Sequence, residues 1–330
     1  MDNVMPSDKE RSFVDILKSI APYIAIAFII LSYLGFAGDF IRIKVDGNKT
    51  YYTLASILSD FSFSCNFLVW IGVLLPAAAI ALIAFFPKKK EMIFASMAIM
   101  IVSTVFTFII KDLYASKFKN AESSFALWGV WMPSFMAIST FILLLSTCES
   151  EAYTVTDICE CGMLIAMAFV LNFIKLFSMP TGGSINLQMV PLFILALRRG
   201  PIKGFVACGL VYGLLTCLTD GYGLATFPFD YLIGFGSTCV LGFVSKVVFD
   251  SKRKFYDYVG ILLIVAGGVV ATCLRLLGST ISSMVLYDYT FADGIVYNAA
   301  YIPLQGLFAL IVTVALYGPL QKLNKIYPVR

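Results

Sequence analysis

The sequence predicts an all-α, polytopic membrane protein of about ten helices. Hydrophobic residues make up 60% of its 330 residues and charged residues only 13%, and the mean hydropathy is +0.89. This composition lies far outside the range of soluble globular domains. Apolar runs separated by charged or Gly/Pro-containing turns place the helices at residues 20–37, 63–86, 92–110, 124–146, 158–178, 187–197, 204–218, 228–249, 256–286 and 295–318.

The first four runs form an N-terminal four-helix block. Each is long enough to cross the ~30 Å hydrocarbon core, which takes about 20 helical residues. The first run follows a charged segment without a small-residue cleavage site, so we expect a retained helix rather than a signal peptide. Polar residues within these runs, such as Asn66 and Ser103, indicate hydrogen bonds between helices rather than a site.

The acidic segment 147–157 is the best domain boundary in the chain. It interrupts the apolar pattern with carboxylates, and no internal repeat relates the parts on its two sides. We therefore divide the chain into residues 1–151, a four-helix membrane block to which the sequence assigns no role, and residues 152–330, a six-helix bundle.

One run of the second block is too short to span a membrane. Asn186–Leu197 has 12 residues and rises roughly 18 Å as a helix, well short of ~30 Å. A glycine-containing polar turn precedes it, and the basic turn Arg198-Arg199-Gly200 follows it. The backbone must therefore break within the membrane, which is tolerated only where it is buried in protein or lines a polar cavity. Such a cavity is a candidate binding site.

The basic residues predict a multi-pass protein of the cell membrane with both termini in the cytoplasm. In that orientation the inside segments hold sixteen of the 24 Lys and Arg residues and the outside segments seven, with Arg275 left within a helix. The positive-inside rule favours this arrangement. The inside set is Lys9, Arg11, Lys18, Lys88, Lys89, Lys90, Arg198, Arg199, Lys203, Lys246, Lys252, Arg253, Lys254, Lys322, Lys325 and Arg330, and the outside set is Arg42, Lys44, Lys49, Lys111, Lys117, Lys119 and Lys175.

With this topology, polar and aromatic residues of the second block gather at the outer helix ends, where we also expect Arg275, Ser279 and Tyr287. A charged side chain in an apolar membrane segment costs free energy, so such residues indicate function. The gathered residues suit a small polar, cationic and aromatic molecule, with Asp230 as counter-ion and tyrosines for stacking. The alternatives are an Asp230–Arg275 ion pair and a membrane-belt role for Tyr287 and Tyr289. The gathered residues are Thr181, Ser184, Asn186, Asp220, Tyr222, Asp230, Tyr231, Arg275, Ser279, Tyr287, Asp293, Tyr297, Asn298 and Tyr301.

The sequence argues against an enzyme and predicts no cofactor. It contains no histidine, no Gly-x-Ser-x-Gly elbow and no phosphate-binding loop. Most of its eight cysteines, Cys273 included, fall in or beside apolar runs and are expected to be buried small hydrophobes. No basic stripe with interleaved aromatics suggests nucleic acid, so the expected surroundings are membrane lipid and protein partners.

Three motifs of the second block match a known family. They are the Met179-Pro180-x-Gly182-Gly183-Ser184 turn, which is followed by Pro191 and by Ala196-Leu197-Arg198-Arg199-Gly200, the pair Asp230-Tyr231, and the pair Tyr297-Asn298 with Tyr301 downstream. Through them, residues 158–320 resemble the thiamine-specific substrate-binding (S) component of energy-coupling factor (ECF) transporters. Residues 1–150 lie outside the resemblance.

The resemblance implies binding of thiamine from outside, without enzymatic activity, and delivery inward by a transmembrane coupling protein and two ATPases. A small-residue motif on the first helix of the S component docks onto the coupling protein, and Gly162-x-x-x-Ala166 stands at that place here. The implied substrate-binding residues are Asp230, Tyr231, Asn298, Ser279, Tyr287, Tyr301, Arg275 and Tyr222.

The chain departs from the family pattern at three pocket positions. Aligned on Arg275, the family's histidine falls on Ser279, its tryptophan on Tyr287 and a tyrosine on Asp293. The substrate expected is therefore thiamine or a closely related heterocycle. An S component for another small molecule, and a membrane sensor or assembly protein that uses a vitamin-binding domain, stay open as alternatives.

Overall fold

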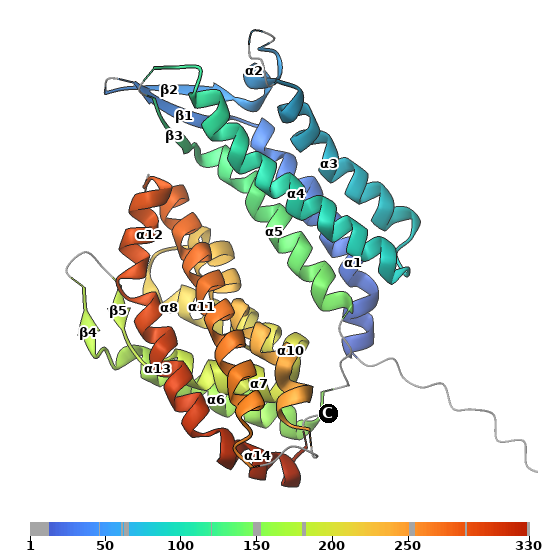
Figure 1. Ribbon diagram of the computed structural model, residues 1–330, viewed down its shortest axis with the longest axis vertical. Helices are drawn as coiled ribbons and strands as arrows, with labels where there is room; N and C mark the ends of the chain where they lie inside the picture. The colour runs from blue at the N-terminus through green and yellow to red at the C-terminus, as the bar shows by residue number, and fades with distance from the viewer. Residues whose placement is uncertain are drawn as a thin grey trace, which may run out of the picture.

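The protein consists of two helical bundles that lie side by side (Figure 1). The structure is a computed structural model that describes residues 13–45, 47–60, 62, 66–119, 121–147, 153–179, 183–250, 255–287 and 289–328. The first bundle ends at residue 147 and the second begins at residue 153, so the predicted boundary at 151/152 falls outside the described residues. Thr181, Cys65 and Cys148 also fall outside them.

The first block is a four-helix bundle with a small sheet at one end. Its four long helices, α1, α3, α4 and α5, correspond to the four predicted runs. The elements are α1 (Phe13–Ser32), η1 (Tyr33–Phe36), β1 (Asp39–Val45), β2 (Asn48–Thr53), α2 (Leu54–Leu58), α3 (Asn66–Phe85), α4 (Lys90–Ala115), β3 (Glu122–Phe125) and α5 (Leu127–Thr147).

The sheet is an addition to the predicted helices. β1 lies in the middle and pairs antiparallel with both β2 and β3, in the order β2-β1-β3. Arg42 in β1 donates from Nε to the Ser124 hydroxyl of β3 at 2.9 Å, which helps to hold the strand that leads into α5. The fourth apolar run therefore begins as a strand, and its helix starts only at Leu127.

The second block contains the longer helices α6, α7, α11 and α13 and a set of shorter elements around them. Its elements are α6 (Val155–Phe173), β4 (Phe177–Ser178), β5 (Ser184–Ile185), α7 (Met189–Phe205), η2 (Val206–Tyr212), α8 (Gly213–Asp220), η3 (Leu224–Thr226), η4 (Phe227–Ile233), α9 (Gly234–Gly236), η5 (Ser237–Cys239), α10 (Val240–Val248), α11 (Tyr258–Leu286), α12 (Phe291–Ala299), α13 (Ile302–Ala315) and α14 (Tyr317–Ile326).

The chain reverses direction at Gly200, within α7. Gly200 has φ 78° and ψ 178°, a conformation that favours glycine. Residues at equal distances on either side of it meet: the Tyr212 hydroxyl donates to Gln188 Oε1 at 2.5 Å, and the Cys208 thiol lies 3.7 Å from the Leu192 carbonyl oxygen. Met189–Phe205 thus contributes two antiparallel limbs. The first limb ends at Gly200 and is too short to cross a bilayer, as the sequence predicts.

The described helices are sufficient for a polytopic membrane protein. Eight of them are long and apolar enough to cross a membrane, or nine when the pair α12–α13, bent by 41° at Ala300–Tyr301, is taken as one span. The segment Met189–Asp220 counts among the eight although it is folded back at Gly200. The prediction of an all-α membrane fold is confirmed.

Aromatic side chains join the two blocks. Trp131 of α5 lies 5.8 Å from the ring of Phe229 in η4, and Phe141 of α5 lies 5.0 Å from Phe205 at the end of α7. Met284 of α11 is buried in the apolar core of the first block. The first block therefore packs against η4 and α11, and α6 lies on the far side of the second block (Figure 1).

Candidate functional site

The candidate site is built around η4, a π-helical turn that carries Asp230 and Tyr231. In a π-helix each backbone hydrogen bond spans one residue more than in an α-helix, and such segments often occur at functional sites. A second π-helical segment, η2, packs against η4, and glycines allow the close approach: a Cβ on Gly213 would lie 3.1 Å from the Tyr231 carbonyl oxygen. The buried Tyr231 ring donates its hydroxyl proton to Asp220 Oδ2 at 3.2 Å.

Asp230 faces α11. Its carboxylate interacts electrostatically with the hydroxyls of Ser279 and Ser282 on that helix. Among the described residues it makes no ion pair within 4.0 Å, so the alternative of an Asp230–Arg275 pair is wrong for this structure.

Arg275 and Ser279 lie within α11, and Tyr287 follows the end of this helix. Both Arg275 and Ser279 are buried in the Tyr258–Met284 span. The apolar run is helical almost to its end, so Arg275 lies about three turns before the last residue of the helix. The position of the three residues relative to the outer interface stays a prediction.

Asn298 occupies the centre of a hydrogen-bond network rather than an open position. Its Nδ2 donates to Ser283 Oγ and to the Gly294 carbonyl oxygen, both at 2.9 Å, and its Oδ1 accepts the Tyr301 hydroxyl at 2.8 Å. The side chain is 1% exposed. Asn298 therefore fixes α12 to α11 and orients the Tyr301 ring.

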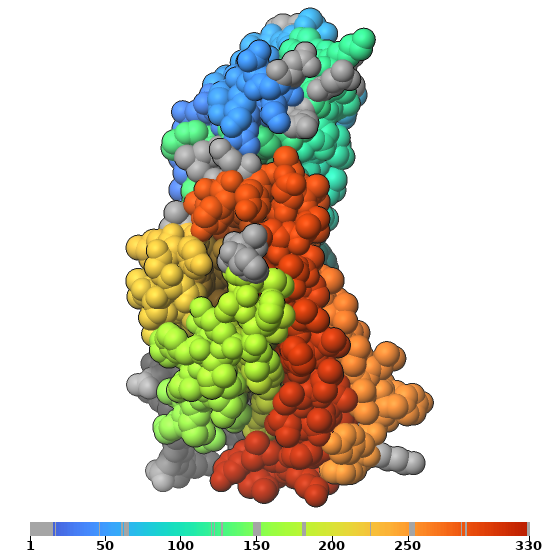
Figure 2. Space-filling view, turned by 90° about the vertical axis from the view of Figure 1, so that its left-hand side faces the viewer, coloured from blue at the N-terminus to red at the C-terminus, as the bar shows by residue number. Residues whose placement is uncertain are grey.

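Four tyrosines form a row along one end of the second block. Successive ring centroids lie 6.5 Å apart for Tyr287 and Tyr289, 5.8 Å for Tyr289 and Tyr297, and 6.1 Å for Tyr297 and Tyr301. Tyr287 is 51% exposed, and partial desolvation raises the pKa of its phenol. Tyr222 is 60% exposed beyond α8, at the edge of the site. The η3–η4 segment (yellow) and α12 (orange) flank a recess at this end (Figure 2).

Gly183, in the turn before α7, packs against Tyr301 of the same tyrosine row. Gly183 has φ +77°, and a Cβ built on it would lie 2.7 Å from the Tyr301 ring, so no other residue fits without displacing that ring. On the adjoining strand, the Ser184 carbonyl accepts a hydrogen bond from Gln305 Nε2 of α13. Gly183 and Ser184, at the end of the turn that the sequence singles out, therefore lie beside the candidate site.

Three buried polar residues of this region were not predicted. Tyr212 and Gln188 hydrogen-bond to each other across the α7 hairpin, and Gln305 reaches the Ser184 carbonyl. Gln305 Oε1 and the hydroxyl of Ser282 are buried without a hydrogen-bond partner. A single uncharged polar residue in an apolar run gives a weak signal, because such residues commonly bond between helices.

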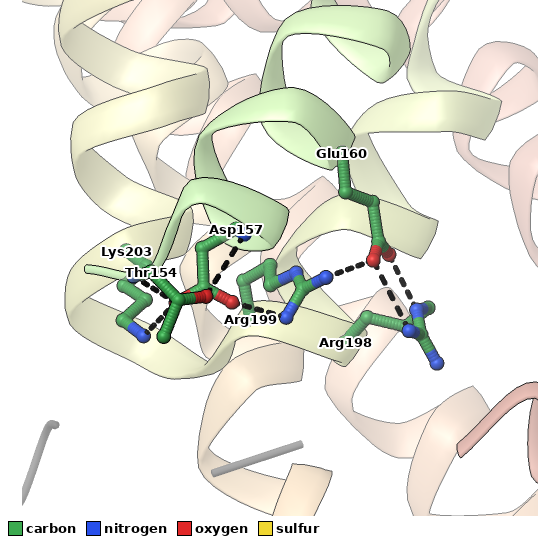
Figure 3. Close-up of polar contacts among 6 residues, drawn as sticks. All are labelled: Thr154, Asp157, Glu160, Arg198, Arg199 and Lys203. Carbon is green, nitrogen blue, oxygen red and sulfur yellow. Dashed lines mark hydrogen bonds and ion pairs between the residues drawn. The ribbon is translucent and has the colours of Figure 1, made fainter. Parts of the chain in front are cut away.

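A buried ion cluster fastens α6 to the tip of the α7 hairpin (Figure 3). Glu160 pairs with both Arg198 and Arg199, and Asp157 pairs with Arg199 and, at 2.6 Å, with Lys203 Nζ. All five side chains are at most 15% exposed. Asp157 also closes a capping box with Thr154 at the start of α6. The cluster lies at the end of the bundle that the predicted topology places inside.

The opposite face of α6 is open. Gly162 and Ala166 are both exposed, and no atom lies within 4 Å of a Cβ built on Gly162. Large apolar side chains flank them, with Ile158 59% and Met163 65% exposed. Figure 2 views this side of the molecule and shows α6 (yellow-green) at the surface. Cys159 of α6 and Cys273 of α11 are also exposed, so the expectation that they are buried is wrong.

Comparison with known proteins identifies the family of the second block. Residues 158–325, half of the chain, match the family described as "Thiamine transporter protein (Thia_YuaJ)". The thiamine transporter ThiT of Bacillus subtilis (strain 168) is 28% identical over 187 residues, which are 50% of this chain and 92% of that protein. A solved structure of ThiT from Listeria monocytogenes covers 51% of this chain and 97% of its own, with 23% identity and a TM-score of 0.44. These relatives are transporters, not enzymes, and on the match over residues 158–325 the chain belongs to the thiamine transporter protein family.

Proposed function

We propose that this protein is the substrate-capture (S) component of an ECF-type transporter and binds thiamine from outside the cell. Besides the family membership, one observation supports the proposal most. Asp230, the tyrosine row and the Gly183 turn come from four separate segments and converge at one end of the second block.

The residues suit the chemistry of thiamine. Its thiazolium ring is cationic and aromatic, so a carboxylate offers a counter-charge and tyrosine faces offer stacking and cation–π contacts. Asp230 supplies the carboxylate, Tyr231, Tyr287 and Tyr301 supply rings, and Ser279 lies beside Asp230. Tyr222 lines the edge of the site, and Asn298 acts through Tyr301.

The proposed delivery step needs a partner complex. Among the described residues we assign no ATP-binding group, and ECF transporters use a transmembrane coupling protein and two ATPases. We place the docking surface for the coupling protein on the open α6 face, around Gly162 and Ala166. The same proposal puts both termini in the cytoplasm, with the buried ion cluster of Figure 3 at the inner end.

Titration calorimetry of the purified full chain with thiamine tests the proposed site. We expect Asp230→Asn to weaken binding by about 10- to 100-fold, because a charge-assisted contact contributes about 1.5–3 kcal/mol. The control is Asp39→Asn, which removes an exposed carboxylate from the first block and is expected to leave the affinity unchanged. If the wild-type chain does not bind thiamine, the proposal is wrong. Equal affinity of Asp230→Asn and wild type would remove Asp230 from the site.

A further inference from the structure

Arg275 is a buried cation whose hydrogen-bonding capacity is largely unused. It is 6% exposed, and its Nε and Nη1 have no hydrogen-bond partner. Its Cζ lies 4.7 Å from the ring centroid of Phe235, so a cation–π contact holds the guanidinium in place without engaging its N–H groups. A buried charge without hydrogen bonds is costly, which indicates that the guanidinium serves a partner.

The surroundings of Arg275 place it toward the candidate site. The Phe235 ring under the guanidinium lies 4.9 Å from the Tyr212 ring of η2 and 6.0 Å from the Tyr231 ring of η4. Arg275 also interacts electrostatically with Tyr301 at the α12–α13 junction and with Asp230 of η4. Gly234 packs on the aliphatic stem, where a Cβ would lie 3.8 Å from Arg275 Cγ. The guanidinium is therefore surrounded by the same elements that carry the acid and the rings of the site, one turn below Ser279.

The site thus contains the Asp230 carboxylate and the Arg275 guanidinium, which do not form a direct ion pair. Among the described residues, no carboxylate oxygen lies within 4.0 Å of an Arg275 nitrogen. A ligand that carries only a positive charge matches Asp230 and leaves the guanidinium unpaired. A ligand with a positive and a negative group matches both.

We propose that Arg275 determines specificity for an anionic group of the substrate, and that the preferred substrate class is a phosphate monoester of thiamine. This inference rests on the proposed function. The thiazolium meets Asp230 and the tyrosine rings, and the phosphate oxygens accept hydrogen bonds from Arg275. A guanidinium is permanently charged and its planar donors match phosphate geometry, which makes it the side chain best suited to this task.

The test compares thiamine with thiamine monophosphate by titration calorimetry on three full-length proteins: wild type, Arg275→Met and Arg275→Lys. We expect wild type to bind the monophosphate at least as tightly as thiamine. Arg275→Met is expected to lose about 10- to 100-fold more affinity for the monophosphate than for thiamine. Arg275→Lys, which keeps the charge, is expected to lose less than Arg275→Met for the monophosphate.

The outcomes separate this inference from the proposed function. If wild type binds thiamine but binds the monophosphate more than about tenfold more weakly, the inference fails and the proposed function stands, and this measurement needs no variant to fold. Equal losses for both ligands in Arg275→Met would show a structural role only and also reject the inference. Failure of wild type to bind either ligand would reject both proposals.

Discussion

At the scale of single residues, the turn before α7 and the middle of α12 depend on each other. Gly183 leaves room for the Tyr301 ring, and Tyr301 donates its hydroxyl proton to Asn298. Asn298 Nδ2 in turn donates a hydrogen bond to Ser283 Oγ of α11. A change at one end of this chain of contacts therefore moves a ring that we assign to the site.

Gly183→Ala tests this dependence. The added Cβ would lie 2.7 Å from the Tyr301 ring, and the positive φ of +77° adds about 1–2 kcal/mol of backbone strain. We expect thiamine affinity to fall by about tenfold, a loss of about 1.4 kcal/mol, measured by calorimetry. Gly47→Ala is the matched control, because Gly47 has φ +84° but no atom within 4 Å of its Cβ position. Equal affinity of the two variants would contradict the argument.

At the scale of elements, the sequence predicts the segments that obey simple length and charge rules. The short run before Arg198-Arg199-Gly200 and the break after it are predicted, because too few apolar residues are available to span a bilayer. The three-stranded sheet was missed, although Asp46-Gly47 between β1 and β2 is a hairpin signal. The prediction was based on the length of the apolar runs, and the strands between these runs were therefore not predicted.

For the candidate site, the sequence suggests which residues to consider but not how they are arranged. Asp230, Tyr231 and the tyrosines stand out because charges and rings at helix ends are conspicuous in an apolar sequence, and their role in binding stays a prediction. The burial of Arg275 and the internal bonds of Asn298 depend on how far α11 extends and on where α12 bends, which no local pattern specifies.

One face of α6 is held to the α7 hairpin by the buried ion cluster, and the opposite face is exposed. This arrangement suits a helix that docks a partner. Its span has the smallest buried share of the eight candidate spans, 17%. Gly162→Leu places a bulky side chain on the open face without touching the rest of the bundle. We expect thiamine uptake by cells that co-produce the coupling protein and ATPases to fall by about tenfold or more, with thiamine affinity of the purified chain unchanged.

Cys273→Leu is the control for that experiment. Cys273 is exposed on α11 of the same bundle, so the variant adds similar bulk to a different face. Normal uptake by Gly162→Leu would place the docking surface elsewhere.

At the scale of the whole molecule, the first block is attached to the elements that carry the candidate site. Trp131 meets Phe229, the residue before Asp230, and Met284 of α11 is buried in the core of the first block. The face of α6 that we assign to the coupling protein lies on the other side (Figure 1). The first block can therefore act on the substrate end without obstructing the docking face.

Trp131→Ala tests whether the first block supports the site. Removing the indole takes away the contact to Phe229 and the stacking on Phe135, which lies 5.1 Å away. We expect a loss of about 1–3 kcal/mol in stability by thermal unfolding and a weaker affinity for thiamine. Trp70→Ala is the control, because Trp70 is 45% exposed on α3. Unchanged affinity in Trp131→Ala would show that the site works independently of the first block.

The reversal at Gly200 also governs how the protein enters the bilayer during its synthesis. The first limb of the hairpin cannot be inserted as a span by itself, so both limbs must enter together as one unit. The tip of that unit carries Arg198, Arg199 and Lys203, whose charges are balanced by Asp157 and Glu160 of α6. Because α6 leaves the ribosome first, the counter-charges are already present when the basic tip emerges.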